Sequence, residues 1–272
     1  MVNAAIPADM HAEILRRLRA AEDQHQVKIL YCVESGSRAW GFFSPDSDFD
    51  VRFLYAHKPE RYLSFDVEAR RDVIEYPIID EIDCNGWDLR KALYLFTRTN
   101  GALLEWLNSP ICYIEEGGLA QQLRELAPQA INSIALCYHY SHMARNNARE
   151  YLRDGQVKLK KYFYILRPLL AIRYIEQDLG VPPVEFANLV SAVAPQEIHA
   201  PIGELLDLKI NSPEVAFGPP LPSLNKFIDQ EIERHGDRFH GQGRPDILDG
   251  NRVRDQLNEI FRSTLAEAFP NP

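Results

Sequence analysis

The fold is decided by the stretch Gly36-Ser37-Arg38-Ala39-Trp40-Gly41, which is followed after five residues by Ser47-Asp48-Phe49-Asp50-Val51. Residues 27–33, just upstream, are apolar and rich in β-branched side chains, which is typical of a buried strand. The first stretch therefore begins where a strand ends. Gly36 has no Cβ, and Ser37 offers a hydroxyl and a backbone N–H, so this turn can hold an anion such as a triphosphate.

Two carboxylates follow on a second predicted strand, over residues 48–53. Alternation along a strand places Asp48 and Asp50 on one face, while Phe49 and Val51 point into the core. Neighbouring carboxylates repel each other at neutral pH unless a dication lies between them, and Mg²⁺ prefers oxygen ligands with room left for substrate phosphates. The pattern therefore predicts a Mg²⁺ site at Asp48 and Asp50.

The acidic run that starts at Asp46 is also compatible with other classes of site. A calcium loop of the EF-hand type needs glycine at its sixth position and glutamate at its twelfth, which here are Val51 and His57, so that class is excluded. An Asp-x-Asp pair alone also suits a glycosyltransferase, but the preceding Gly-Ser turn argues against this assignment. Asp46 itself is assigned to the turn.

The Gly-Ser turn, the further glycine and Ser-Asp-x-Asp together resemble the signature of the DNA polymerase beta-like nucleotidyltransferase superfamily. A second block is similar to bacterial predicted nucleotidyltransferases assigned to RNA repair: Asp83-Cys84-Asn85-Gly86-Trp87-Asp88-Leu89-Arg90-Lys91-Ala92-Leu93, then Leu104-Glu105-Trp106-Leu107 and Ser109-Pro110. The resemblance implies an α/β (α+β) nucleotidyltransferase domain with a short mixed sheet. It also implies Mg²⁺-dependent transfer of a nucleoside monophosphate from an NTP such as ATP to an acceptor hydroxyl, with an RNA end as the expected acceptor.

The same resemblance implies a third carboxylate on a neighbouring strand, which would help a second metal ion activate the attacking hydroxyl. Asp83 is the preferred residue because it opens the second block, and Glu81 on the same predicted strand face stays an alternative. Asp88 is expected in the first turn of a helix, where it complements the helix dipole. Two Mg²⁺ ions are expected, with Mn²⁺ as a substitute. The predicted catalytic and metal-binding residues are Asp48, Asp50 and Asp83.

Cationic side chains near the predicted site are candidates for phosphate contact. Arg38 and Arg52 lie close in sequence to the turn and the acidic pair, although an exposed arginine is often merely solvated. Lys161 belongs to a locally basic region, residues 139–167, in the second half of the chain. Superfamily members commonly bring a helical domain against the nucleotide. The predicted nucleotide-binding residues are Gly36, Ser37, Arg38, Arg52 and Lys161.

The order of sequence patterns predicts two domains in 272 residues. Residues 73–84 have strand character, Asn85-Gly86 is interpreted as a turn, and residues 87–97 have helical periodicity. We place a catalytic domain at 1–116 and an all-helical domain at 117–272, in which a short strand is expected only at 215–217.

Composition narrows the choice of partners and compartment. The formal charge of −9 argues against a generally basic nucleic-acid binder, so RNA would need a local basic patch. Four scattered cysteines without a C-x-x-C pair favour reduced thiols, and no apolar segment predicts a membrane span or signal peptide. We expect a cytoplasmic protein with no membrane partner; the sequence does not indicate an oligomeric state.

Two alternative functions stay open at this level. One is a catalytically silent nucleotide-binding or interaction protein that keeps the fold, although such a protein has no need of both Asp48 and Asp50. The other is nucleotidyl transfer to a protein or a small molecule in place of RNA, which the acidic composition favours slightly.

Overall fold

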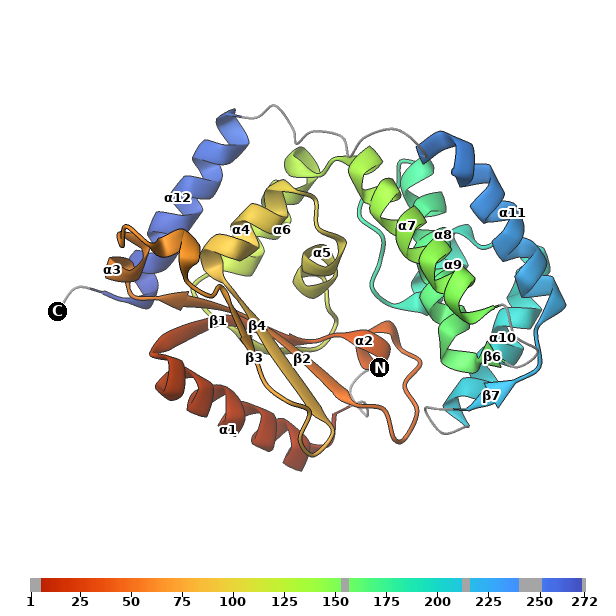
Figure 1. Ribbon diagram of the computed structural model, residues 1–272, viewed down its shortest axis with the longest axis horizontal. Coiled ribbons are helices and arrows are strands. Elements are labelled where there is room, and N and C mark those ends of the chain that lie inside the picture. The colour runs from red at the N-terminus through yellow and green to blue at the C-terminus, as the bar shows by residue number, and fades with distance from the viewer. Residues whose placement is uncertain (1–5, 153–156, 212–215, 240–250, 271–272) are drawn as a thin grey trace. The chain divides into compact units, whose positions relative to one another are not determined.

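A computed structural model describes residues 6–152, 157–211, 216–239 and 251–270 (Figure 1). The chain forms two compact units. The first comprises the described parts of 1–39, 48–131 and 247–272, and the second those of 40–47 and 132–246. This division differs from the predicted boundary at residue 116, because two helices of the predicted helical domain belong to the first unit.

The elements of the first unit are α1 (Ala8–His25), β1 (Val27–Glu34), α2 (Gly36–Trp40), β2 (Phe49–His57), α3 (Pro59–Tyr62), the 3₁₀ turn η1 (Val67–Ala69), β3 (Val73–Glu75), β4 (Ile82–Asp88), α4 (Leu89–Thr97), α5 (Gly101–Leu107), β5 (Cys112–Glu115), α6 (Leu119–Ala130) and α12 (Asn251–Ala268). The last residue of α2 is grouped with the second unit. The elements of the second unit are α7 (Ser133–Tyr151), β6 (Val157–Lys158), α8 (Leu159–Glu176), α9 (Phe186–Val193), α10 (Gln196–Ile210), β7 (Phe217–Gly218) and α11 (Pro222–Phe239).

A five-stranded sheet forms the centre of the first unit, with strand order β3-β4-β2-β1-β5. Strands β2 and β4 pair in parallel, and the other pairs are antiparallel. This arrangement confirms the predicted α/β class and short mixed sheet. Helix α1 covers one face, and α4, α5 and α6 lie on the other (Figure 1).

Local sequence explains the helices that cover the sheet. Ile14, Leu18 and Ala21 are spaced three or four residues apart and form the buried stripe of α1. Helix α4 begins after Asp88, whose side chain accepts a hydrogen bond from the Arg90 N–H at 2.8 Å. This N-cap satisfies one of the open donors in the first turn, so the strand-to-helix change occurs at Asp88.

The turn predicted at Asn85-Gly86 is wrong, because both residues lie inside β4. Gly86 is opposite Phe53 in the parallel register, and the Phe53 ring packs where a side chain would be: a Cβ on Gly86 would lie 2.1 Å from its Cε2 atom. Glycine is therefore required here by close packing and does not end the strand.

Replacement Gly86→Ala is expected to destabilise the protein by about 1–3 kcal/mol, because the new methyl group overpacks against Phe53. The double variant Gly86→Ala/Phe53→Leu should recover part of this loss, since the smaller side chain makes room. Urea unfolding of the four proteins of this cycle measures the coupling. Strictly additive effects of the two substitutions would show that the Phe53 ring is not the reason why glycine is required at position 86.

The C-terminal part of the chain does not form one helical domain. Helices α6 and α12 pack together in the first unit, where α12 also contacts α4 and its Phe261 ring lies edge-on to Tyr62. The second unit contains α7 to α11, and the short segment 40–47 packs into it. Within that unit, the Phe42 ring stacks on Phe163 with ring centroids 4.2 Å apart.

The short strand predicted at 215–217 had a mixed outcome. Phe217 lies in β7, which pairs with β6, whereas Val215 falls outside the described residues. Strands β5 and β6 were not predicted.

All four cysteines are free thiols, as predicted, with Cys112 exposed and the other three buried. Among the described residues, none of the helices combines the length and apolar character needed to span a membrane.

Candidate functional site

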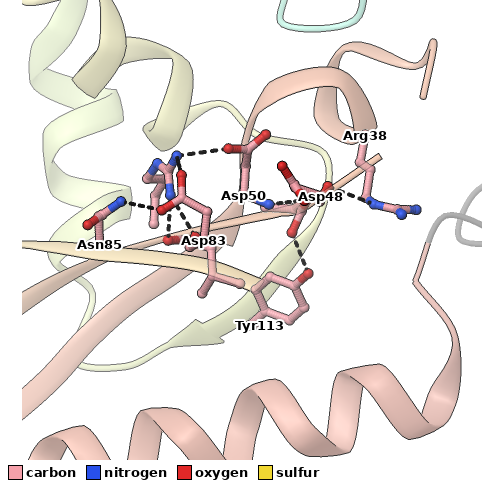
Figure 2. A network of polar contacts seen from close by, with 9 residues as sticks. Arg38, Asp48, Asp50, Asp83, Asn85 and Tyr113 are labelled. Carbon is pink, nitrogen blue, oxygen red and sulfur yellow. Dashed lines mark hydrogen bonds and ion pairs between the residues drawn. The ribbon is translucent and has the colours of Figure 1, made fainter. Parts of the chain in front are cut away.

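The predicted carboxylates gather where β2 and β4 begin, next to the end of β1 (Figure 2). Asp50 and Asp83 are directly paired in the parallel register of these strands. The same sheet face continues to Trp87, whose ring stacks on Trp106 of α5 with centroids 3.8 Å apart. Helix α5 thus covers the far end of this face, while Asp50 and Asp83 remain 27% and 23% exposed.

Gly36 brings the turn after β1 against the acidic pair. Its φ is +58°, and a Cβ built on it would lie 1.9 Å from Oδ2 of Asp50. No other residue type fits this position without moving the carboxylate. The backbone is fixed at the same point because the Ser35 N–H donates to the Asp50 carbonyl at 2.9 Å. The predicted phosphate turn and the first metal-binding strand therefore share one corner of the sheet.

Arg52 joins the two central carboxylates. Its Nη2 atom donates to Oδ1 of Asp50 at 2.8 Å and to Oδ2 of Asp83 at 2.7 Å, and its Nη1 atom donates to the Asp83 carbonyl. The other oxygen of Asp83 accepts from Asn85 at 2.6 Å. Arg52 thus neutralises two like charges that would otherwise repel each other, so it holds the site together in this state.

Arg38 has a different position from the one expected of a phosphate-binding residue. It is 6% exposed, its guanidinium lies 3.8 Å from the centre of the Phe49 ring, and its Nε atom donates to the Asp48 carbonyl. Burial lowers the pKa of this guanidinium. Arg38 therefore ties α2 to the start of β2. Asp48 itself is exposed and directly precedes the strand, whereas Phe49 is buried, as the predicted alternation requires.

A buried acid supports the site from the end of β1. Glu34 is fully buried, and its carboxylate accepts from the Asp50 N–H at 2.9 Å and from the Tyr113 hydroxyl at 2.6 Å. Burial raises the pKa of Glu34 to about 7, against the opposing effect of these two hydrogen bonds. Glu34 thus fixes the backbone of Asp50 and is itself held by Tyr113, whose ring lies on the side of the sheet that faces α1 (Figure 2).

The raised pKa of Glu34 predicts a pH-dependent contribution to stability. The folded chain binds this proton more tightly than the unfolded chain, so the contribution is greatest below about pH 4.5 and declines until about pH 7. Glu34→Gln removes the ionisation, while its amide oxygen can still accept from the Asp50 N–H and its NH₂ group can donate to the Tyr113 hydroxyl oxygen. Relative to the native chain, it should gain about 3 kcal/mol of unfolding free energy between pH 4.5 and pH 8, because the shift spans about 2.5 units.

Urea unfolding of both proteins between pH 5 and pH 8 measures this difference. Because all other groups titrate alike in the two proteins, their contributions cancel when the two free energies of unfolding are subtracted. A difference that does not change with pH would contradict the assignment of the buried proton to Glu34.

The structure also places the remaining predicted residues. Ser37 is partly exposed in α2, next to Gly36. Glu81 lies in the turn before β4 with φ +63°, so it does not share a strand face with Asp83 as predicted. Lys161 is on α8 of the second unit, where its amine lies 3.9 Å from the centre of the Tyr151 ring. Asp88 caps α4, in agreement with its predicted place at the start of a helix.

The basic region of the second unit is largely engaged within that unit. Arg167 is 3% exposed and stacks over the Trp40 ring, and its Nε atom donates to the Val184 carbonyl. Burial lowers the pKa of Lys161. Arg167 and Lys161 thus make contacts within the second unit, whereas Arg149 of the same region is exposed.

Three residues of the site were missed at the sequence level. Glu34 and Tyr113 carry the buried support beneath Asp50, and Asn85 holds Asp83. A signal for Glu34 did exist, because it is an acid directly after seven residues of strand character and two positions before Gly36. Asn85 was hidden by its interpretation as a turn residue.

The donor chemistry of the site fits Mg²⁺ in part. Asp48 and Asp50 offer carboxylate oxygens near one corner, and Oδ2 of Asp50 lies against the Gly36 turn. Among the described residues, no three Asp, Glu, His or Cys side chains are gathered closely enough to hold a metal ion. Asp83 is already occupied, because Arg52 and Asn85 donate hydrogen bonds to its two carboxylate oxygens. Asp83 must leave Arg52 before it can serve as a third ligand.

Comparisons with known proteins found the following similarities. A family model described as "RNA repair pathway DNA polymerase beta family" matches residues 10–263. The chain is 47% identical over 261 residues to the "Uncharacterized protein YcgL" of Bacillus subtilis (strain 168), covering 96% of this chain and 98% of that protein. A solved nucleotidyltransferase-like protein from Exiguobacterium sibiricum 255-15 aligns with 11% identity and a TM-score of 0.32, over 90% of this chain and 87% of that one.

Proposed function

Because the chain belongs to the RNA repair pathway DNA polymerase beta family, we propose that it is a metal-dependent nucleotidyltransferase. It transfers a nucleoside monophosphate from an NTP to the hydroxyl of an RNA end, and pyrophosphate leaves from the α-phosphate as the new ester bond forms. The observation that carries the proposal is the packing of Gly36 on the carboxylate of Asp50. A turn suited to phosphate and the acidic pair suited to Mg²⁺ thereby lie at one corner of the sheet.

The residues of this corner have separate roles in the proposal. The Gly36–Ser37 turn binds the triphosphate through backbone N–H groups and the Ser37 hydroxyl. Asp48 and Asp50 hold Mg²⁺, which Mn²⁺ can replace. The bound metal supplies neutralisation of the phosphate charge and a lower pKa for the acceptor hydroxyl. Arg38 and Glu34 position the two aspartates through their backbone: Arg38 donates to the Asp48 carbonyl, and Glu34 accepts from the Asp50 N–H.

Asp83 and Arg52 act together in the proposal. Before the substrate binds, Arg52 compensates the charges of Asp50 and Asp83. An incoming triphosphate offers Arg52 an alternative anionic partner. Asp83 is then free to act as the third carboxylate beside a second metal ion, close to the acceptor hydroxyl. Lys161 is proposed to contact the triphosphate from the helical unit.

Incubation with each NTP labelled at its α-phosphate, with Mg²⁺, tests the function. The label is expected to enter RNA with a free 3′-hydroxyl and to be absent when EDTA is added. Protein and small-molecule acceptors serve as comparison substrates. Labelling of one of these in place of RNA would contradict the proposed acceptor, and no labelling of any acceptor would contradict the enzyme assignment.

A further inference from the structure

The second signature block does not serve the carboxylate site alone. Asp83 lies near the start of β4, but Asp88, Arg90 and Lys91 lie at its other end, roughly 16 Å away along the strand. These three residues line a cavity of about 680 Å³ that belongs entirely to the first unit. This part of the block therefore has a role that the proposed transfer chemistry does not use.

The cavity concentrates positive charge in an acidic chain. Five of its lining residues are cationic and three are acidic, whereas the chain as a whole carries −9. The cationic residues come from three separate segments, namely α3, the residues after η1 and the first turn of α4. The five are Arg61, Arg70, Arg71, Arg90 and Lys91. Two further acids, Asp66 and Glu75, pair with Arg70 and Arg71, so a polyanion has to compete with carboxylates for four of the five cations.

The cations of the cavity are held in place by weak ion pairs. Arg90 pairs with Glu68, and the Lys91 amine lies 3.0 Å from a carboxylate oxygen of Asp72. These pairs are largely solvent-exposed, and pairs of this kind contribute about 0–1 kcal/mol. A phosphate group can therefore compete with the carboxylates for these cations at little cost, and it is a better partner for a guanidinium fork.

The basic cavity continues into a longer groove. A second hollow of about 380 Å³ shares Arg90 and Tyr94 with the first, and adds Arg254 and Phe261 from α12. Tyr94, which lines both hollows, is 62% exposed. Exposed aromatic rings beside clustered cations are the combination with which proteins bind single-stranded nucleic acid, because bases stack on the rings while cations contact phosphates.

We propose that this groove along α4 binds the phosphate backbone and bases of a single-stranded RNA segment at a distance from its reacting end. The choice of RNA as the ligand rests on the proposed function, whereas the groove itself does not. The groove would supply the local basic patch that an acidic protein needs in order to hold a nucleic-acid substrate.

Fluorescence anisotropy with a 5′-fluorescein-labelled single-stranded oligoribonucleotide, in EDTA so that no transfer occurs, tests the groove. Arg61→Gln/Lys91→Gln should weaken binding by about tenfold or more and reduce the salt-dependence slope by about 1.4, since each contact to a single strand contributes about 0.7. The matched control Arg16→Gln/Arg19→Gln removes the same charge from α1 and should change binding less than about twofold. Tyr94→Ala should weaken binding about tenfold and leave the slope unchanged, because stacking releases no counterions.

Equal losses in the groove variant and the α1 control would overturn the proposal, because they would show only a response to net charge. Displacement of the oligonucleotide by the same molar phosphate concentration of inorganic triphosphate, with no effect of Tyr94→Ala, would also overturn it. The outcome is independent of the transfer assay: if the native chain binds the oligonucleotide in EDTA but transfers no label to it with Mg²⁺, the proposed function is contradicted and the groove stands.

Discussion

Asp50→Asn and Asp48→Asn are each expected to lower the rate of nucleotidyl transfer by at least about 10³-fold, which corresponds to about 4 kcal/mol of lost transition-state stabilisation. An amide offers one neutral oxygen where the carboxylate binds a dication, so the metal site loses charge and a ligand atom. The fold should persist, because Asp48 is exposed and because Arg52 keeps Asp83 as its ion-pair partner when Asp50 is replaced.

The control for both variants is Asp46→Asn, which changes an exposed acid of the preceding turn and should keep the transfer rate within about threefold of native, as is usual for surface substitutions. Steady-state transfer of an α-labelled NTP, together with circular dichroism to check folding, gives the comparison. If Asp48→Asn or Asp50→Asn kept full transfer activity, the proposed metal mechanism would be wrong.

Gly36→Ala is expected to have the next largest effect, a loss of at least about 10²-fold in transfer. A Cβ at this position would lie 1.9 Å from Oδ2 of Asp50, so either the carboxylate or the turn must move. A misplacement of about 1 Å at a reacting centre is enough to cause a loss of this size. The positive φ adds a backbone penalty of about 1–2 kcal/mol for alanine.

Gly41→Ala separates these two contributions. Gly41 also has a positive φ, +87°, but no atom lies within 4 Å of a Cβ built on it. This variant carries the backbone penalty without the contact, and it should retain transfer within about threefold of native. Equal losses of activity in the two variants would show that the contact between Gly36 and Asp50 does not organise the site.

Short-range patterns in the sequence predicted most of the first unit. Strand β1, the Gly36 turn and the alternation of Asp48 and Asp50 depend on neighbours within a few residues, so they could be recognised from the residues alone. A carboxylate on a neighbouring strand, with Asp83 preferred over Glu81, was expected from the resemblance of the second block; Asp83 lies on β4 opposite Asp50 of β2, a register that was not predicted.

Contacts between distant segments account for what could not be predicted. Asn85-Gly86 has the local chemistry of a turn, but Phe53, more than thirty residues earlier, packs on Gly86 and keeps it in the strand. The amphipathic pattern of α12 shows that one face is buried without showing against which helices, so its return to α4 and α6 was not foreseen. Arg52 was expected to meet phosphate, and its pairing with two carboxylates became visible only in three dimensions.

The central claim is that a turn suited to triphosphate and the Asp48–Asp50 pair meet at one divalent ion. A crystal structure of the chain with Mn²⁺ and a non-hydrolysable NTP tests it most directly, because the anomalous signal locates the ion. We predict an ion within about 2.2 Å of carboxylate oxygens of both Asp48 and Asp50, with the triphosphate on the N–H groups of the Gly36–Ser37 turn. An ion and triphosphate bound elsewhere, with Asp50 and Asp83 still joined by Arg52, would contradict the account.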